Sequence, residues 1–300
     1  MLREFISYLE AERRYSALTV RNYRRDIERL WAWLGCTDQD FAPRLLTQDD
    51  VRQWIVQRTE VDKISPQSMN RELSSLRAFY HWMLREGLVE KDIMRTIPSL
   101  RTQHRLPSFV PESRMSEVLD EYTRPSDDFI EQRESLIILM FYTCGLRLSE
   151  LVGINTTDFS GDFRSLTVLG KGDKERRVPI LEAVREKILQ HIETIQRQNI
   201  CNSQEKPLFL TLKGERISRS VVYRTVQQAL KSHGVQGKKS PHVLRHTFAT
   251  HLLNGGADMR EIQELLGHSS LLATEVYTHN SIARLKDIYA KAHPREKGGK

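Results

Sequence analysis

The sequence predicts a mainly α-helical fold with a small antiparallel β-sheet, divided between two domains. Apolar residues recur at steps of three and four through the first hundred residues, which is the period of one helix face. A stretch with three prolines and no periodicity follows at 97–112, and residues 162–180 have a strand–turn–strand pattern. We therefore expect a helical domain at 1–96, a linker at 97–112, a second domain at 113–293 and a polar tail at 294–300.

Local signals mark where four helices of the first domain begin. The first opens the chain, and Ser16 precedes the second. Thr47, with Asp50 three residues later, forms a variant of the capping box and starts the third. Ser65 is an N-cap that precedes Pro66 at the first helical position of the fourth. These helices are predicted to form a small bundle.

The second domain is predicted to mix helices with a few strands. In chain order we expect a buried helix at 129–145, two strands around a turn at 171–174, a long helix from Leu181, a short strand at 207–211, helices after Ser218 and Pro241, and a helix capped by Asp258 that ends at Gly267. The two strands around the turn predict a hairpin, and most of the residues of this domain are predicted to be helical.

The composition is that of a soluble globular protein with a surplus of positive charge. Charged residues make up 28% of the chain, and 46 basic against 39 acidic residues give a net charge of +7. We expect no membrane span, because no apolar run of about 18 residues occurs, and no secretory signal, because the amino terminus carries Arg3, Glu4 and Glu10 and has no long apolar core. Three scattered cysteines favour reduced thiols and a cytoplasmic location. The charge permits nucleic-acid binding but does not by itself indicate it.

A set of polar residues near the carboxyl end has the chemistry of an anion site. His242 and Arg245 are three apart on a helix whose other face is apolar, and His268 and Tyr277 follow after tight turns. We expect these side chains to share one pocket. Arginine forks hold phosphate oxygens bidentately, and two of them would lower the cost of ionising a tyrosine, about 4 kcal/mol at pH 7. Such a set is what metal-free phosphoryl transfer to tyrosine requires.

Ordinary structural interpretations remain open for each of these residues. Arg147, just after a glycine, could belong to a structural ion pair with Glu150, and Lys171 could be part of a solvated turn. His242 and His246 are four apart, a spacing that can bind zinc, but no third ligand sits at a useful spacing. A single tyrosine is more often a packing residue than a nucleophile. The combined pattern favours the catalytic interpretation.

Two polar helix faces in the first domain have the residue types of a DNA-binding surface. The first face consists of arginines spaced by four residues on the second helix, and the other face lies along the fourth helix. The residues are Arg21, Arg25 and Arg29 on the second helix, and Asn70, Arg71, Ser74 and Arg77 on the fourth. They suit contacts with phosphates and groove edges, but a solvated surface has the same composition, so both interpretations stay open.

Four ordered motifs resemble those of the tyrosine site-specific recombinases, within the phage integrase family and its Xer subfamily. The motifs are "TCGLRLSEL", "GKGDKERRVPI", "HVLRHTFATHLL" with "IQELLGHSS", and "YTH". The match spans roughly residues 135–293, and the amino-terminal helices resemble the core-binding domain of the family. The segment "SSLLATEVYTH" departs from it, since Thr-Thr-Gln more often precedes the tyrosine. The resemblance implies a two-domain C-shaped clamp of a core-binding domain and an α/β catalytic domain.

The resemblance also implies six catalytic residues. They are Arg147, Lys171, His242, Arg245, His268 and Tyr277. The arginines would clamp the scissile phosphate, and both histidines would support it. The lysine would protonate the 5′-oxygen, and the tyrosine would attack to give a 3′-phosphotyrosyl intermediate. Neither a metal nor ATP is needed, so no cofactor is expected.

The partners that the resemblance implies are double-stranded DNA with a paired recombination site and a second related recombinase. Four sites on two duplexes imply a heterotetramer, with "SIARLKDIYAKAHP" at 281–294 as the C-terminal helix that docks into a neighbour. A septal DNA translocase is a further candidate partner, and the expected role is resolution of chromosome dimers at cell division. Alternatives are an integrase of a mobile element, a type IB topoisomerase-like enzyme, a non-catalytic DNA-binding regulator and a zinc hydrolase.

Overall fold

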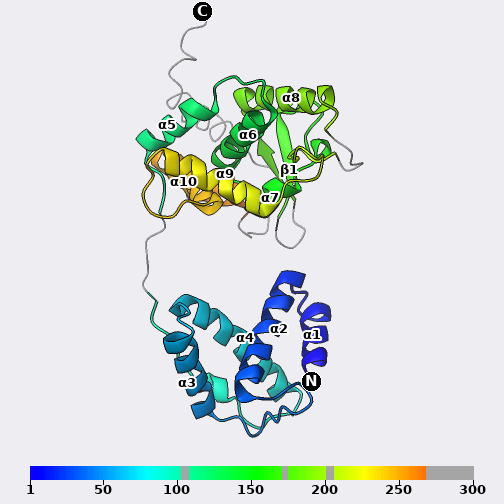
Figure 1. Ribbon diagram of the computed structural model, residues 1–300, viewed down its shortest axis with the longest axis vertical. Helices are drawn as coiled ribbons and strands as arrows, with labels where there is room; N and C mark the ends of the chain where they lie inside the picture. The colour runs from blue at the N-terminus through cyan, green and yellow to red at the C-terminus, as the bar shows by residue number, and fades with distance from the viewer. Residues whose placement is uncertain (103–107, 171–174, 201–205, 268–300) are drawn as a thin grey trace, which may run out of the picture. The chain divides into compact units, whose positions relative to one another are not determined.

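The computed structural model describes residues 1–102, 108–170, 175–200 and 206–267, and the chain divides into two compact units, Met1–Arg105 and Leu106–Lys300 (Figure 1). Within these described ranges helices dominate both units and the sheet is one antiparallel pair of strands, which confirms the predicted fold class. Across the described ranges, no helix is both long and apolar enough to span a membrane. The clamp arrangement and the domain boundaries stay predictions.

The first unit contains the four predicted helices. They are α1 (Leu2–Ala11), α2 (Ala17–Leu34), α3 (Gln48–Val56) and α4 (Pro66–Arg85), with a π-helical turn η1 (Gln57–Val61) after α3 and a 3-10 turn η2 (Ile93–Thr96) after α4. The predicted caps are confirmed. Ser16 and Ser65 accept from the third residue of α2 and α4, and Thr47 and Asp50 form the capping box of α3.

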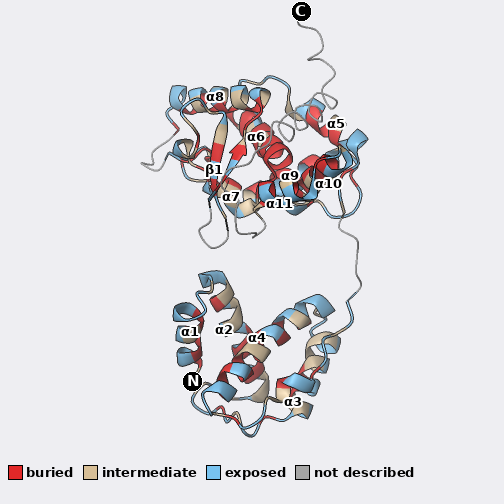
Figure 2. Cartoon of the chain, turned by 180° about the vertical axis from the view of Figure 1, so that it is seen from behind, coloured by how far each residue is buried: buried red, intermediate tan, exposed pale blue. Residues whose placement is uncertain are grey.

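The core of this unit is built on α4. Its stripe of large apolar side chains is fully buried, and α2 packs along it. The buried residues of the stripe are Met69, Leu73, Leu76, Tyr80 and Met83. Figure 2 shows buried stretches of α4 alternating with exposed ones. The polar face of α4 that was predicted to contact DNA therefore lies on a well-anchored helix.

The second unit packs its helices around α6. Its elements are α5 (Glu112–Tyr122), α6 (Phe129–Cys144), α7 (Leu148–Gly153), η3 (Thr156–Asp158), β1 (Ser165–Leu169), β2 (Glu175–Pro179), α8 (Glu182–Arg197), α9 (Arg219–Ser232), α10 (Pro241–Asn254) and α11 (Met259–Leu266). The helix α6 is buried on nearly all sides and contacts α5, α8, α9 and α10 (Figures 1 and 2). Helix α9 begins directly after Ser218, as predicted, and the cap predicted at Asp258 for α11 is confirmed.

The hairpin of β1 and β2 has the predicted antiparallel pairing, with Leu166 opposite Val178 and Val168 opposite Arg176. These four residues point to the buried side, because burial alternates along both strands. The short strand predicted at 207–211 is wrong. Only isolated bridges occur there, and the apolar residues of the segment are buried without alternation, since the segment crosses the core instead of extending the sheet.

Both ends of the stretch at 97–112 are held by their own units. Ile97 is buried in the first unit, and the side chain of Asn70 accepts from the backbone N–H of Leu100 at 2.8 Å. In the second unit Val110 is buried, and its backbone N–H donates to Oγ1 of Thr247 at 2.9 Å. Helix α10 therefore contacts the chain where it enters the second unit.

Candidate active site

Three arginine side chains of the second unit converge on the buried carboxylate of Glu150. Arg147 donates to Oε1 from Nη1 at 2.7 Å. Arg176 makes a bidentate pair, from Nη1 to Oε1 at 2.9 Å and from Nη2 to Oε2 at 2.8 Å. Nη1 of Arg245 lies 3.7 Å from Oε2. Residues from α7, β2 and α10 thus meet at one point.

The turn between α6 and α7 positions Arg147. Gly145 ends α6 in the left-handed conformation, with φ of 57°, and Arg147 precedes the first residue of α7. The backbone N–H of Arg147 donates to Oε2 of Glu150 at 2.7 Å. The acid of the first turn therefore fixes both the backbone and the guanidinium of Arg147, and the ion pair that the sequence allowed is present.

Arg245 is held by two backbone carbonyls. Its Nη1 donates to the oxygen of Gly145 at 2.6 Å, and its Nη2 donates to the oxygen of Leu266 at 2.5 Å. Phe248, one turn further along α10, lies so close to Gly145 that a Cβ at that glycine would sit 2.5 Å from Cδ1 of the ring. Glycine is therefore required at the C-cap of α6 both for its φ and for this approach.

Arg176 was not predicted as a site residue. It points inward from β2, and besides its pair with Glu150 its Nε donates to the backbone oxygen of Leu265 at 2.9 Å. The sequence did indicate that Arg176 is buried, because the alternation of the strand places it on the same inward face as Val178. A buried arginine needs an acid, and Glu150 is that acid.

The electrostatics of this cluster favour an anion. Burial alone would raise the pKa of Glu150, but hydrogen bonds from Arg176 and Arg147 lower it to about 2, so the carboxylate is ionised. Burial and the charge of Arg147 lower the pKa of Arg245 to about 10, which leaves it protonated at neutral pH. Among the described residues, no second carboxylate lies within ion-pair distance of the three arginines. The cluster keeps a surplus of positive charge.

The six residues predicted to be catalytic fall into two groups. Arg147 and Arg245 come together at Glu150, and His242 is exposed in the first turn of α10, on the same face as Arg245. Lys171, His268 and Tyr277 lie outside the described residues. Two connections point toward them. In the sequence Lys171 falls between β1 and β2, and Nη2 of Arg147 donates at 3.4 Å to the backbone oxygen of Gly267, which precedes His268.

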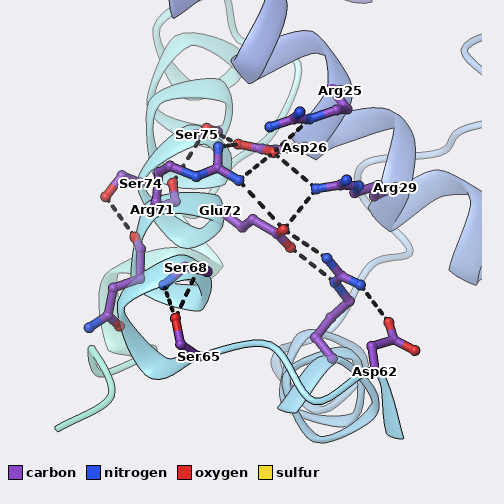
Figure 3. A network of polar contacts seen from close by, with 12 residues as sticks. Arg25, Asp26, Arg29, Asp62, Ser65, Ser68, Arg71, Glu72, Ser74 and Ser75 are labelled. Atoms are coloured by element: carbon purple, nitrogen blue, oxygen red, sulfur yellow. Dashed lines mark hydrogen bonds and ion pairs between the residues drawn. The ribbon is translucent and has the colours of Figure 1, made fainter. Parts of the chain in front are cut away.

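Several of the residues predicted to bind DNA have partners within the first unit. Arg25, Arg29 and Arg71 contact the buried acids Asp26 and Glu72 (Figure 3). Neither acid was predicted to have a role. The three arginines remain between 40% and 50% exposed, so the same side chains also face solvent.

The other predicted DNA-binding residues differ in how they are engaged. Asn70 and Arg77 hold the chain after η2, since Asn70 donates to the backbone oxygen of Leu100 at 2.9 Å and Arg77 donates to that of Ile97 at 2.8 Å. Ser74 donates to the backbone of its own helix, and Arg21 is exposed. Structural contacts therefore occupy part of the face that was predicted to contact DNA.

The described residues offer no ready metal site. No three His, Cys, Asp or Glu side chains gather there as a metal-binding group would. The pair of His242 and His246, considered for zinc because of its spacing, thus has no third ligand in that part of the chain.

Comparison with known proteins connects both units to one family. Residues 110–284 match the family described as "Phage integrase family", and residues 2–87 match the family described as "Phage integrase, N-terminal SAM-like domain". Tyrosine recombinase XerC of Chlorobaculum tepidum is 34% identical over 98% of this chain and 94% of its own length. Tyrosine recombinase XerD of Lacticaseibacillus casei is 33% identical over 98% of this chain and 99% of its own.

Solved structures show the same fold. The Tn1549 transposon integrase in complex with a circular intermediate DNA has a TM-score of 0.68 at 20% identity, over 96% of this chain and 99% of that one. The XerH recombinase bound to a palindromic difH substrate has a TM-score of 0.67 at 19% identity, over 97% and 84%. With two matching family domains and relatives above 30% identity over nearly the whole chain, this protein belongs to the phage integrase family and is a tyrosine recombinase of the Xer type.

Proposed function

We propose that this recombinase exchanges DNA strands at a specific site through a 3′-phosphotyrosyl intermediate formed by Tyr277. The observation that carries the proposal is the convergence of Arg147 and Arg245 on Glu150, with more positive than negative charge at that point. The motif order around these residues supports the assignment of Lys171 and Tyr277 to the same site.

The chemistry proceeds as a balanced exchange of one phosphodiester bond for another. The hydroxyl oxygen of Tyr277 attacks phosphorus, and the bond from phosphorus to the 5′-oxygen breaks. His242 takes the proton of the tyrosine, and Lys171 gives a proton to the leaving 5′-oxygen. The 5′-hydroxyl of a partner strand then attacks the phosphotyrosine and reverses the step. Neither ATP nor a metal enters this balance.

The arginines supply most of the stabilisation in this mechanism. Ionising a tyrosine at pH 7 costs about 4 kcal/mol, and a further barrier comes from negative charge on the phosphate oxygens. Glu150 holds the guanidinium of Arg147 in place before DNA arrives, so that little reorganisation is needed as charge develops. His268 adds a donor to the same phosphate.

The biological role that fits best is resolution of chromosome dimers at cell division, because the curated relatives are named XerC and XerD. Exchange between two duplexes needs four active sites, which we assign to a heterotetramer with a second related recombinase. The segment 281–294 is our candidate for the contact between neighbours, and a septal DNA translocase is a candidate activator. We place the protein in the cytoplasm, where its DNA substrate lies.

Trapping of a covalent adduct tests the proposal. A pool of singly nicked duplexes with randomised arms should yield a protein–DNA adduct that survives denaturant and forms equally well in the presence of a chelator. Tyr277→Phe should abolish the adduct and retain duplex binding, whereas Tyr223→Phe, at an exposed tyrosine of α9, should leave the yield unchanged. An adduct formed by Tyr277→Phe would show that another residue is the nucleophile. Sequencing the trapped DNA identifies the site.

A further inference from the structure

At the interface of α2 and α4, each helix provides a buried carboxylate that pairs with an arginine of the other helix (Figure 3). Asp26 of α2 is 0% exposed and accepts from Arg71 of α4, from Nη1 at 2.6 Å and from Nη2 at 3.1 Å. Glu72 of α4 is 2% exposed and accepts from Nη1 of Arg29 on α2 at 3.0 Å. Each helix thus provides the acid that holds an arginine of the other.

Further donors fix both carboxylates in place. Ser75 donates to Oδ2 of Asp26 at 2.8 Å. Arg58 of η1 donates to Glu72 from Nε at 3.1 Å and from Nη2 at 2.8 Å, and is itself only 14% exposed. Buried carboxylates that accept from several donors are held rigidly in place. Because Arg58 is largely buried, its role in this network is structural.

Arg29 and Arg71 differ from Arg58 because they keep an outward edge. Their side chains are 40% and 42% exposed, although each is anchored on a buried acid. Among the described residues, Nε and Nη2 of Arg29 have no hydrogen-bond partner. A free surface arginine loses rotamer freedom when it binds a phosphate, whereas an arginine that is already held loses less.

We propose that Asp26 and Glu72 are positioning residues that hold Arg29 and Arg71 as a preformed clamp for a phosphate of duplex DNA. The proposal rests on the proposed function in so far as DNA is the ligand. It makes an unusual claim about sign. By bulk electrostatics an acid next to DNA weakens binding, but these two acids strengthen it, because they orient the guanidinium forks.

The sign can be measured with a matched pair of substitutions on α2. Asp26→Asn and Glu28→Gln each remove one negative charge, but Glu28 is exposed and Asp26 is buried. Binding of the full-length protein to a fixed 30-base-pair duplex of arbitrary sequence is followed at several salt concentrations. Glu28→Gln should bind at least as tightly as the wild type. Asp26→Asn should bind about 3- to 10-fold more weakly, with a salt slope reduced by about one phosphate contact.

A double substitution separates positioning from a general effect on the fold. In an Arg71→Gln background, Asp26→Asn should change affinity less than about 2-fold, since Arg71, the arginine that hydrogen-bonds this acid from both Nη atoms, is gone. Equal weakening in both backgrounds would overturn the proposal, as would an Asp26→Asn protein that binds as tightly as Glu28→Gln.

Arg71→Lys supplies a second route if Asp26→Asn does not fold, because it keeps a cation beside the buried acid. Lysine lacks the fork, so a several-fold loss of affinity is expected, and wild-type affinity would contradict the clamp. This measurement of duplex binding also does not depend on formation of the covalent adduct. A wild-type protein that binds neither this duplex nor the DNA trapped in the adduct experiment overturns the proposed function. A wild type that binds, with Arg29→Lys and Arg71→Lys proteins that bind as tightly as the wild type, overturns the clamp alone.

Discussion

The two units combine arginine and carboxylate in different proportions. In the second unit one carboxylate, Glu150, faces three arginines, of which Arg176 and Arg245 are 4% and 10% exposed. In the first unit two buried carboxylates, Asp26 and Glu72, face four arginines, and three of these are at least 40% exposed. The network of the first unit, around Asp26 and Glu72, lies at the surface. The network of the second unit, around Glu150, lies largely inside that unit.

The difference shows how each unit can use an anion. Buried positive charge without a matching acid is costly, so the second unit favours an anion strongly and suits charge stabilisation in a reaction. The network of the first unit has the same surplus of two positive charges, but three of its four arginines face water, where an added phosphate gains less and salt screens the gain. Under the proposed function, binding and catalysis would thus use the same residue types at different depths.

Removing the acids should reveal this difference most strongly. Glu150→Gln leaves two buried guanidiniums without a carboxylate and should destabilise the second unit by about 3–5 kcal/mol. Glu72→Gln leaves arginines that water or a second acid can reach, so a loss of about 1–3 kcal/mol is expected. Urea unfolding followed by circular dichroism measures both. Equal losses would mean that burial of the arginines does not set the cost.

Replacing an arginine by lysine should separate catalysis from binding. Arg245→Lys keeps the charge but loses the two bonds to backbone carbonyls, so adduct formation in a single turnover should slow by about 10²–10³-fold. Arg29→Lys, at the surface network, should weaken duplex binding and leave the rate at saturating protein within about 2-fold. A near-normal rate for Arg245→Lys would show that Arg245 does not grip the phosphate.

Local signals made most elements predictable from the sequence. The caps at Ser16, Thr47 and Ser65 act within three residues, and the apolar stripe of α4 follows from spacing alone. The pair of Arg147 and Glu150 was also foreseeable, since three residues separate them. The strand predicted at 207–211 failed because a run of apolar residues fits a core crossing as well as a strand.

Long-range pairing was not predictable in the same way. The sequence marks Arg245 as basic, but its bonds to Gly145 and Leu266 depend on how α6, α10 and α11 pack. The acids Asp26 and Glu72 sit among polar residues on faces that look solvated, and burial appears only once α2 meets α4. Such contacts join residues far apart in the chain, so no local pattern contains them.

Acid should weaken the second network through Glu150. Its pKa is about 2 in the folded protein against an ordinary value of 4.5, so the stabilisation is complete above about pH 4.5 and is lost as the pH falls through about 2. The full effect is about 3 kcal/mol, of which roughly 2 kcal/mol should disappear between pH 5 and pH 3. The measurement is the difference in unfolding free energy between wild type and Glu150→Gln, which cancels the other carboxyl groups. A difference that does not change with pH would contradict the ion-paired state.

Two glycines give the mildest comparison of the units, because both end a helix in the left-handed conformation. Gly35 ends α2 with φ of 71° and has nothing within 4 Å of a built Cβ, so Gly35→Ala should cost only the backbone strain, about 1 kcal/mol. Gly145→Ala adds a clash with Phe248 and should cost about 1–3 kcal/mol more.

The second glycine should also affect the chemistry, which separates it further from the first. The oxygen of Gly145 accepts from Arg245, so a shift of this turn moves the guanidinium away from the phosphate. Gly145→Ala should therefore slow adduct formation at temperatures where the protein remains folded, and Gly35→Ala should not. If both substitutions lower stability equally and neither changes the rate, then the turn after α6 caps a helix as the turn after α2 does, and the position of Arg245 is set by α10 and α11 alone.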